Sequence, residues 1–183
     1  MRIVDRRTKV TRRLFLRGTA AGVPAAALAA AGAGISATAA WAQDAKTLTP
    51  DQLATLALMA RDIYPHDHIG DAYYIKAVTP WDAKAGADPA TKAVLVGGIV
   101  LLDGNAQAKH GCAYAAVPWE AQRVVLLQGI EGSVFFQKIR GDLLVSFYNQ
   151  YDPWPKFGYE GSSAEHGGYI HRGFDDIDWL PQG

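Results

Sequence analysis

Two histidines and an aspartate in one short turn are the residues whose types could most directly do chemistry. The segment His66-Asp67-His68 places two imidazoles two positions apart, just ahead of Gly70. Imidazole nitrogens bind metals, and a neighbouring carboxylate can join or orient them. His166 and His171 could complete the set. The pattern allows a self-sufficient metal-binding protein, although it matches no fixed-spacing metal motif. It equally allows a polar turn between two helices, with Asp67 or Asp71 capping the second helix.

Three aspartates near the end of the chain form an acidic cluster. Asp175, Asp176 and Asp178 follow Arg172 within a few residues. Paired carboxylates can do acid–base chemistry, and clustered ones can bind calcium, although the EF-hand spacing is absent here. We favour a solvated or partner-facing acidic strip, which could pair with basic groups on another subunit.

Cys112 is the only cysteine. A lone cysteine excludes an internal disulfide, a cysteine zinc site and a C-x-x-C-H haem attachment. His110 could lower its pKa if the two side chains met. The alternatives are a small buried apolar residue and, in an oxidising compartment, a disulfide to another chain.

No other segment carries a catalytic or cofactor motif. The pairs Gly97-Gly98 and Gly167-Gly168 belong to no G-x-G-x-x-G or Walker pattern, and there is no G-x-S-x-G elbow. We therefore predict no catalytic residue, no cofactor-binding residue and no bound metal in this chain.

The elements that must position these residues are helices. Thr49-Pro50-Asp51-Gln52 combines an N-cap, a first-turn proline and a capping-box glutamine, and predicts a helix over 50–64 that Pro65 ends. A short helix through 72–78 follows, Pro80 stops or kinks it, and 81–86 could add a turn. Asp88-Pro89 starts a helix through the uncharged run 93–102, where valines leave a strand as the alternative.

Two further helices complete the body. One opens at Pro118-Trp119-Glu120, with an apolar stripe of Ala121, Val124, Val125 and Leu127. In the other, Ser133 is the cap and one face holds Phe136, Ile139, Leu143 and Phe147. Residues 43–150 are therefore predicted to form a small all-α helical bundle.

The last segment, 151–183, is a long irregular tail rich in glycine and aromatic residues. Glycine and proline recur too often for a helix or strand, yet disordered tails are normally poor in aromatic residues. Such rings need a surface, which could be the chain's own bundle or a partner. The rings concerned are Tyr151, Trp154, Phe157, Tyr159, Tyr169, Phe174 and Trp179.

Residues 1–42 have the composition of a targeting signal. They carry seven basic side chains and one acid, a net charge of +6, whereas the rest of the chain nets −6. Arg12 and Arg13 precede Phe15 and Leu16, then an Ala/Gly-rich stretch ends at Ala40-Trp41-Ala42. This resembles a twin-arginine export signal with cleavage after Ala42, and a single-pass anchor is the alternative. The acidic remainder argues against nucleic-acid binding.

Several motifs together resemble one family. Leu48 to Leu56 reads Leu-Thr-Pro-x-Gln-x-x-Thr-Leu and is followed by Arg61-Asp62-Ile63-Tyr64-Pro65-His66-Asp67. The tail carries Gly158-Tyr159-Glu160-Gly161-Ser162 and Gly167-Gly168-Tyr169, then Gly173 through Pro181. With the export signal, these segments resemble the small subunit-three family named after gluconate 2-dehydrogenase, and the tail is the more specific part.

The resemblance implies a non-catalytic escort subunit. Members travel folded with a large flavoprotein of the glucose–methanol–choline oxidoreductase type, which holds FAD and in some cases an iron–sulfur cluster. A cytochrome c commonly accepts the electrons. The complex would be periplasmic, would meet the membrane only during export, and would oxidise a sugar or alcohol; from the tail alone, we favour glucoside 3-dehydrogenase. No catalytic residue carries over, because the catalytic histidines lie in the large subunit.

The same reading assigns partner binding to the tail. We expect the anchors among its aromatic, histidine and aspartate side chains. These are Tyr159, His166, Tyr169, Phe174, Asp175, Asp178 and Trp179.

Overall fold

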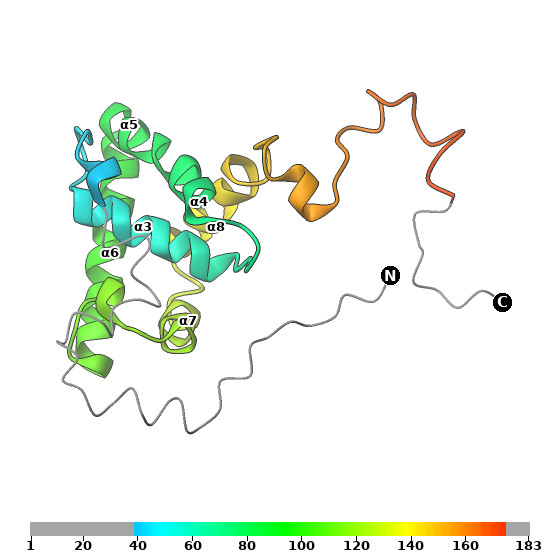
Figure 1. Cartoon of the computed structure of the whole chain (residues 1–183). Helices are drawn as coiled ribbons and strands as arrows, with labels where there is room; N and C mark the ends of the chain where they lie inside the picture. The colour runs from blue at the N-terminus through cyan, green and yellow to red at the C-terminus, as the bar shows by residue number, and fades with distance from the viewer. Residues whose placement is uncertain (1–38, 175–183) are drawn as a thin grey trace, which may run out of the picture.

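The computed structural model describes residues 39–174, and this part of the chain is an all-α bundle from which a long C-terminal segment extends (Figure 1). The predicted fold class is confirmed. The described elements are η2 (Ala39–Ala42), α3 (Pro50–Ile63), α4 (Asp71–Val78), α5 (Pro80–Ala87), α6 (Pro89–His110), η3 (Tyr114–Ala116), α7 (Glu120–Gln128), α8 (Val134–Ser146) and η4 (Trp154–Phe157). No strand occurs between residues 39 and 174.

Helix α3 is the centre of the bundle. The Thr49 side chain accepts from Gln52 N, and the Gln52 side chain accepts from Thr49 N, so the predicted capping box is present. Every residue from Leu53 to Ala60 is buried. A helix buried on all sides must be surrounded by other elements, and α3 contacts α4, α6, α7 and α8.

Helices α4 and α5 meet at Pro80, and α5 fixes the segment that precedes α3. Asp82 accepts backbone hydrogen bonds from Lys46, Thr47 and Leu48 at 2.7 to 2.9 Å. Burial acts to raise the Asp82 pKa, but these three donors outweigh it and lower the pKa. The segment from Lys46 to Leu48 is therefore bound to α5 rather than being a free linker.

The boundary predicted after Ala42 falls inside this packed region. Ala42 is 1% exposed, belongs to the hydrophobic core, and accepts a hydrogen bond from Ala45 N. Trp41 packs against the same core. The folded unit therefore includes η2, which contacts α3, although the sequence assigned its four residues, Ala39–Ala42, to the export signal.

Helix α6 is long and regular, so the strand alternative for 93–102 is wrong. Asp88 caps it by accepting from Ala90 N and Thr91 N, and Gly111 ends it in the left-handed conformation at φ 72°. A Cβ on Gly98 would lie 2.0 Å from the Phe135 ring of α8. Glycine there allows the close crossing of α6 and α8.

The apolar stripe predicted for α7 is partly wrong. Val125 is 50% exposed, whereas Leu126 and the charged Arg123 are buried. In α8, Ser133 caps the helix as predicted, and Ile139, Leu143 and Phe147 are buried while Phe136 is half-buried. Within residues 39–174, no helix combines the length and the hydrophobicity that crossing a membrane would require.

Candidate functional site

The C-terminal segment is fastened to the bundle over its first residues, 150–157, which we call the root. The Gln150 side-chain nitrogen donates to Tyr73 O in α4 and to Ser146 O in α8, each at 3.0 Å. Trp154 Nε1 donates to Tyr148 O at 2.7 Å. These bonds link the root to α8, which directly precedes it, and to α4, which lies 77 residues earlier at Tyr73, so the segment leaves the bundle at a fixed point.

An aromatic cluster completes the root. The Phe157 ring lies 4.9 Å from that of His66 and 5.7 Å from that of Tyr148. His66 also stacks on Phe147 with 5° between the ring planes, and its Nε2 lies 2.9 Å from the Tyr148 hydroxyl. Burial and, secondly, the nearby His68 lower the pKa of His66. The turn at residues 66–68, which the sequence allowed as a metal site, therefore serves as a packing surface for Phe157 of the root.

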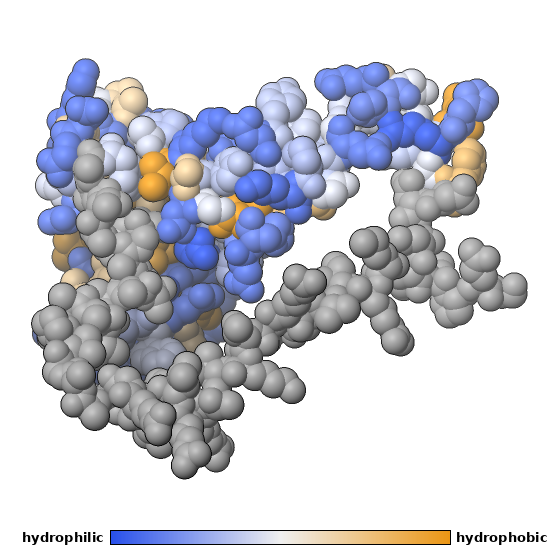
Figure 2. All heavy atoms as spheres, in the orientation of Figure 1, coloured by the Kyte–Doolittle hydropathy of each residue, from blue (hydrophilic) through white to orange (hydrophobic). Residues whose placement is uncertain are grey.

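Beyond the root, residues 158–174 form what we call the arm, which runs away from the bundle (Figure 1). Gly158 has φ 71°, a conformation that favours glycine, and the chain turns outward there. The arm's exposed apolar side chains are Tyr159 (49%), Tyr169 (60%), Ile170 (76%) and Phe174 (78%). Hydrophobic surface on the arm gathers toward its far end (Figure 2).

A few polar contacts shape the arm. Arg172 pairs with the Glu160 carboxylate and lies 5.8 Å from the centre of the Tyr169 ring. His166 Nε2 lies 3.1 Å from the Glu160 carbonyl oxygen. Arg172 and His166 thus bind within the arm, while the apolar side chains around them stay exposed.

The predicted metal ligands do not come together. His66 and His68 lie close, with ring centres 6.0 Å apart, but His66 Nε2 contacts Tyr148 and His166 contacts Glu160. Within residues 39–174, no group of three or more histidine, cysteine or acidic side chains could hold an ion. The metal hypothesis thus gains no support from the geometry.

Of the other predicted site residues, some lie within residues 39–174 and the rest lie outside that described range. Cys112 is partly buried against the core, and its predicted disulfide to another chain stays a prediction. The described range excludes the predicted export motif and the end of the acidic tail. These residues are Arg12, Arg13, Phe15, Leu16, Asp175, Asp176, Asp178 and Trp179.

A buried ion pair, which the sequence analysis missed, ties α3 to α7. Arg123 donates from Nε to Asp62 Oδ2 at 2.6 Å and from Nη2 to Oδ1 at 2.8 Å. The Tyr114 hydroxyl donates to the same carboxylate at 2.5 Å. Burial, and then the Asp62 charge, raise the Tyr114 pKa well above its usual range. The available signal was a carboxylate that closely follows the buried run Leu53–Ala60 of the same helix, since a charge drawn into such a core needs a partner.

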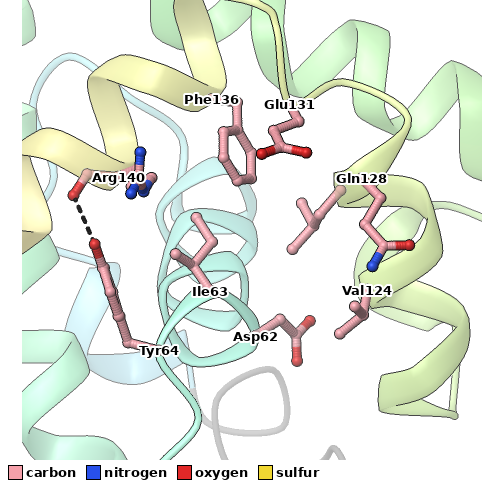
Figure 3. Close-up of a pocket in the computed structure, with 9 residues that line it drawn as sticks. Asp62, Ile63, Tyr64, Val124, Gln128, Glu131, Phe136 and Arg140 are labelled. Atoms are coloured by element: carbon pink, nitrogen blue, oxygen red, sulfur yellow. Dashed lines mark hydrogen bonds between the residues drawn. The ribbon is translucent and has the colours of Figure 1, made fainter.

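A cavity of about 350 Å³ lies beside this pair, between α3, α7 and α8 (Figure 3). Ile63, Val124 and Phe136 give it an apolar lining, while Gln128, Glu131 and Arg140 add polar groups. The charged side chains that line it are both acidic (Asp62, Glu131) and basic (Arg140), and the lining residues include no pair of a nucleophile and a base. The arm and its root therefore remain the candidate functional site.

Comparison with known proteins gives this chain no relative: no family model, no curated protein and no solved structure matches it.

Proposed function

We propose that this chain is a non-catalytic escort subunit, which binds a larger periplasmic enzyme through its arm and stabilises it during and after export. The enzyme would be an FAD-dependent sugar or alcohol dehydrogenase. This chain would itself hold no cofactor, and the partner would hold FAD and, in some complexes, an iron–sulfur cluster.

The observation that carries the proposal is the arm. Three aromatic rings and an isoleucine stand exposed on a segment whose root is bonded to α4 and α8. Tyrosine and other aromatic side chains are favoured anchors in protein interfaces. Exposed apolar side chains gathered on one projecting segment mark an interaction site rather than an ordinary surface. A fixed root also lowers the entropy that the arm loses when it binds.

The kind of partner is supported by the family resemblance of the helix-one and tail motifs. In that family the small subunit carries the export signal, and the large flavoprotein often lacks its own and is carried across the membrane by the small one. The paired Arg12 and Arg13 ahead of Phe15 and Leu16 fit such a signal. Glucoside 3-dehydrogenase is our preferred complex, with a cytochrome c as the electron acceptor.

The test is to co-express the tagged full chain with its flavoprotein and to remove residues 159–183 only, which leaves the root in place. We expect a folded helical protein that no longer retains the flavin-containing partner, as read from the absorbance of the eluate. Point variants refine the result: Tyr159, Tyr169 and Phe174 changed together to Ser should weaken retention at least tenfold.

The matched control is Val145→Ser, which removes an apolar side chain of similar exposure (62%) from α8. It should leave retention unchanged. Full retention of the flavoprotein by the truncated chain would rule out the arm as the docking site.

A further inference from the structure

A pocket of about 600 Å³ lies where the root passes into the arm, at the point where the chain leaves the bundle (Figure 1). We call it the root–arm pocket. Its volume falls within the range of roughly 300–1,000 Å³ that ligand sites occupy, so it has room for a small molecule or a long side chain. Three aromatic rings, two carboxylates and an imidazole line it. These side chains are Tyr151, Trp154, Tyr159, Glu160, Glu165 and His166.

The three rings of the root–arm pocket stand at steep angles to one another, so they form walls rather than a flat stack. The centre of the Trp154 ring lies 4.5 Å from that of Tyr151, with 54° between the planes, and 4.9 Å from that of Tyr159, with 74°. Tyr151 is 72% and Tyr159 49% exposed, so both rings keep surface free for a ligand. The bond from Trp154 Nε1 to Tyr148 O fixes the central ring, which lowers the entropy lost on binding.

The charge around the pocket is negative. Glu160 and Glu165 line it, and no lysine or arginine of the described chain does. The two strongly basic residues of the segment 150–174 contact other groups: Lys156 Nζ lies 5.0 Å from the centre of the Tyr73 ring, and Arg172 pairs with Glu160. Within residues 39–174, the Glu165 carboxylate has neither an ion pair nor a side-chain hydrogen bond. The pocket therefore offers a carboxylate beside aromatic rings, and the described chain supplies no cation to it.

Aromatic faces and a carboxylate together select a cation. The face of an aromatic ring attracts a cation that lies within about 6 Å of the ring centre. A guanidinium suits such a site best, because its plane stacks on a ring while its N–H groups donate to a carboxylate. The arm already contains one such arrangement, since Arg172 pairs with Glu160 and lies 5.8 Å from the centre of the Tyr169 ring. A neutral ligand such as a sugar would leave the charge of Glu165 without a counterpart.

We propose that the root–arm pocket binds an arginine side chain of the flavoprotein partner. This inference rests on the proposed escort function and adds the chemistry of one contact to it. The guanidinium would lie against the aromatic walls, and Glu165 would accept its hydrogen bonds. Because Tyr151 and Trp154 belong to the root, this contact would form beside the bundle, while the exposed rings farther along the arm would supply apolar contacts.

Titrations of the full-length chain alone test the pocket without the flavoprotein. N-acetylarginine amide should shift the NMR signals of Tyr151, Trp154 and Glu165, whereas N-acetylcitrulline amide, which is of the same length but uncharged, should not. Tyr151→Leu and Glu165→Gln should each weaken binding of the arginine probe roughly threefold or more. The controls are Trp119→Leu and Glu131→Gln, which remove an exposed ring and an exposed carboxylate of the bundle and should leave binding unchanged.

Three results of these titrations would overturn the proposal. Equal binding of the arginine and citrulline probes would show that the pocket does not select a charge. Binding of methyl β-glucoside in preference to the arginine probe would identify a sugar site. Absence of any shift at the pocket signals, up to the solubility limit of the arginine probe, would show that the pocket binds no guanidinium.

Retention of the co-expressed flavoprotein separates this inference from the proposed function. Tyr151→Leu and Glu165→Gln in the full chain should each weaken retention roughly threefold or more, and Glu165→Gln should make it less sensitive to salt. If the parent and both variants retain the flavoprotein equally well, the escort function stands and the arginine contact is wrong. If the parent retains no flavoprotein, the escort function is wrong and so is the source given to the arginine, and the titrations alone decide whether the pocket selects a guanidinium.

Discussion

Asp62 shows how one buried charge can be accommodated in an apolar bundle. Its side chain is 0% exposed and that of Arg123 is 5% exposed, yet both carboxylate oxygens are bonded. Taking two charges out of water is costly, so such a pair often adds little net stability. Breaking it is different, because one charge is then left buried without its partner.

We therefore predict that Arg123→Met destabilises the protein by about 3–5 kcal/mol, measured by urea unfolding. Arg140→Met, on the exposed rim of the neighbouring cavity, is the control and should cost less than about 0.5 kcal/mol. Replacing Asp62 by Met in the Arg123→Met variant should restore much of the loss. Equal effects of the two arginine changes would contradict the role given to the pair.

His66 makes the stability of the root depend on pH. Its pKa in the folded protein is lowered below 6.5, so the unfolded chain binds more protons in the window between the two values. Stability contributed at neutral pH is therefore lost as the pH falls below about 6.5. His68, at 6.0 Å, adds repulsion once both rings are charged.

We therefore predict that His66→Phe reduces the loss of folding stability that the parent protein shows as the pH falls. Urea midpoints of the two proteins, measured from pH 7.5 down to pH 5, should converge or cross as the pH falls. His171→Phe, a change of an exposed histidine in the arm, should leave the pH profile unchanged. Parallel profiles for His66→Phe and the parent would refute the assignment.

At the scale of elements, local signals predicted the helices well. The caps at Thr49, Asp88 and Ser133 are formed as the sequence indicated, because each depends on residues two or three positions away. The face of α7 was not predictable in this way. Arg123 is buried and Val125 exposed because the partner of Arg123 lies 61 residues earlier, and helical periodicity carries no information about that contact.

The α6–α8 crossing makes Gly98 a sensitive position. We predict that Gly98→Ala costs about 1–3 kcal/mol, because the added methyl group would displace Phe135. Gly141→Ala, where nothing lies within 4 Å, should instead gain roughly 0.5–1 kcal/mol from helix propensity. Thermal unfolding of both variants checks the contrast, and a stabilising Gly98→Ala would mean that the crossing tolerates a wider separation.

At the scale of the whole molecule, composition identified the tail but could not show which of its rings pack on the chain's own bundle and which stay exposed. The sequence presented seven aromatic rings with two possible docking surfaces. The structure places Trp154 and Phe157 of the root on the chain's own bundle, and it leaves Tyr151 of the root and Tyr159, Tyr169 and Phe174 of the arm exposed. Trp179 lies outside the described residues. That division depends on Tyr148 and His66, which sequence spacing does not connect to the tail. The partner role of the exposed rings remains a prediction.

The Asp62–Arg123 pair also sets an order of events during synthesis. Asp62 leaves the ribosome 61 residues before the guanidinium that neutralises it. Until then, enclosing α3 would bury a carboxylate without its partner, and the core would close only at the cost of protonating or leaving unpaired that group. The bundle therefore matures late, after most of its helices have been made. An export signal at the start of the chain would emerge long before the domain behind it is complete, and a pathway for folded cargo would have to wait for α7.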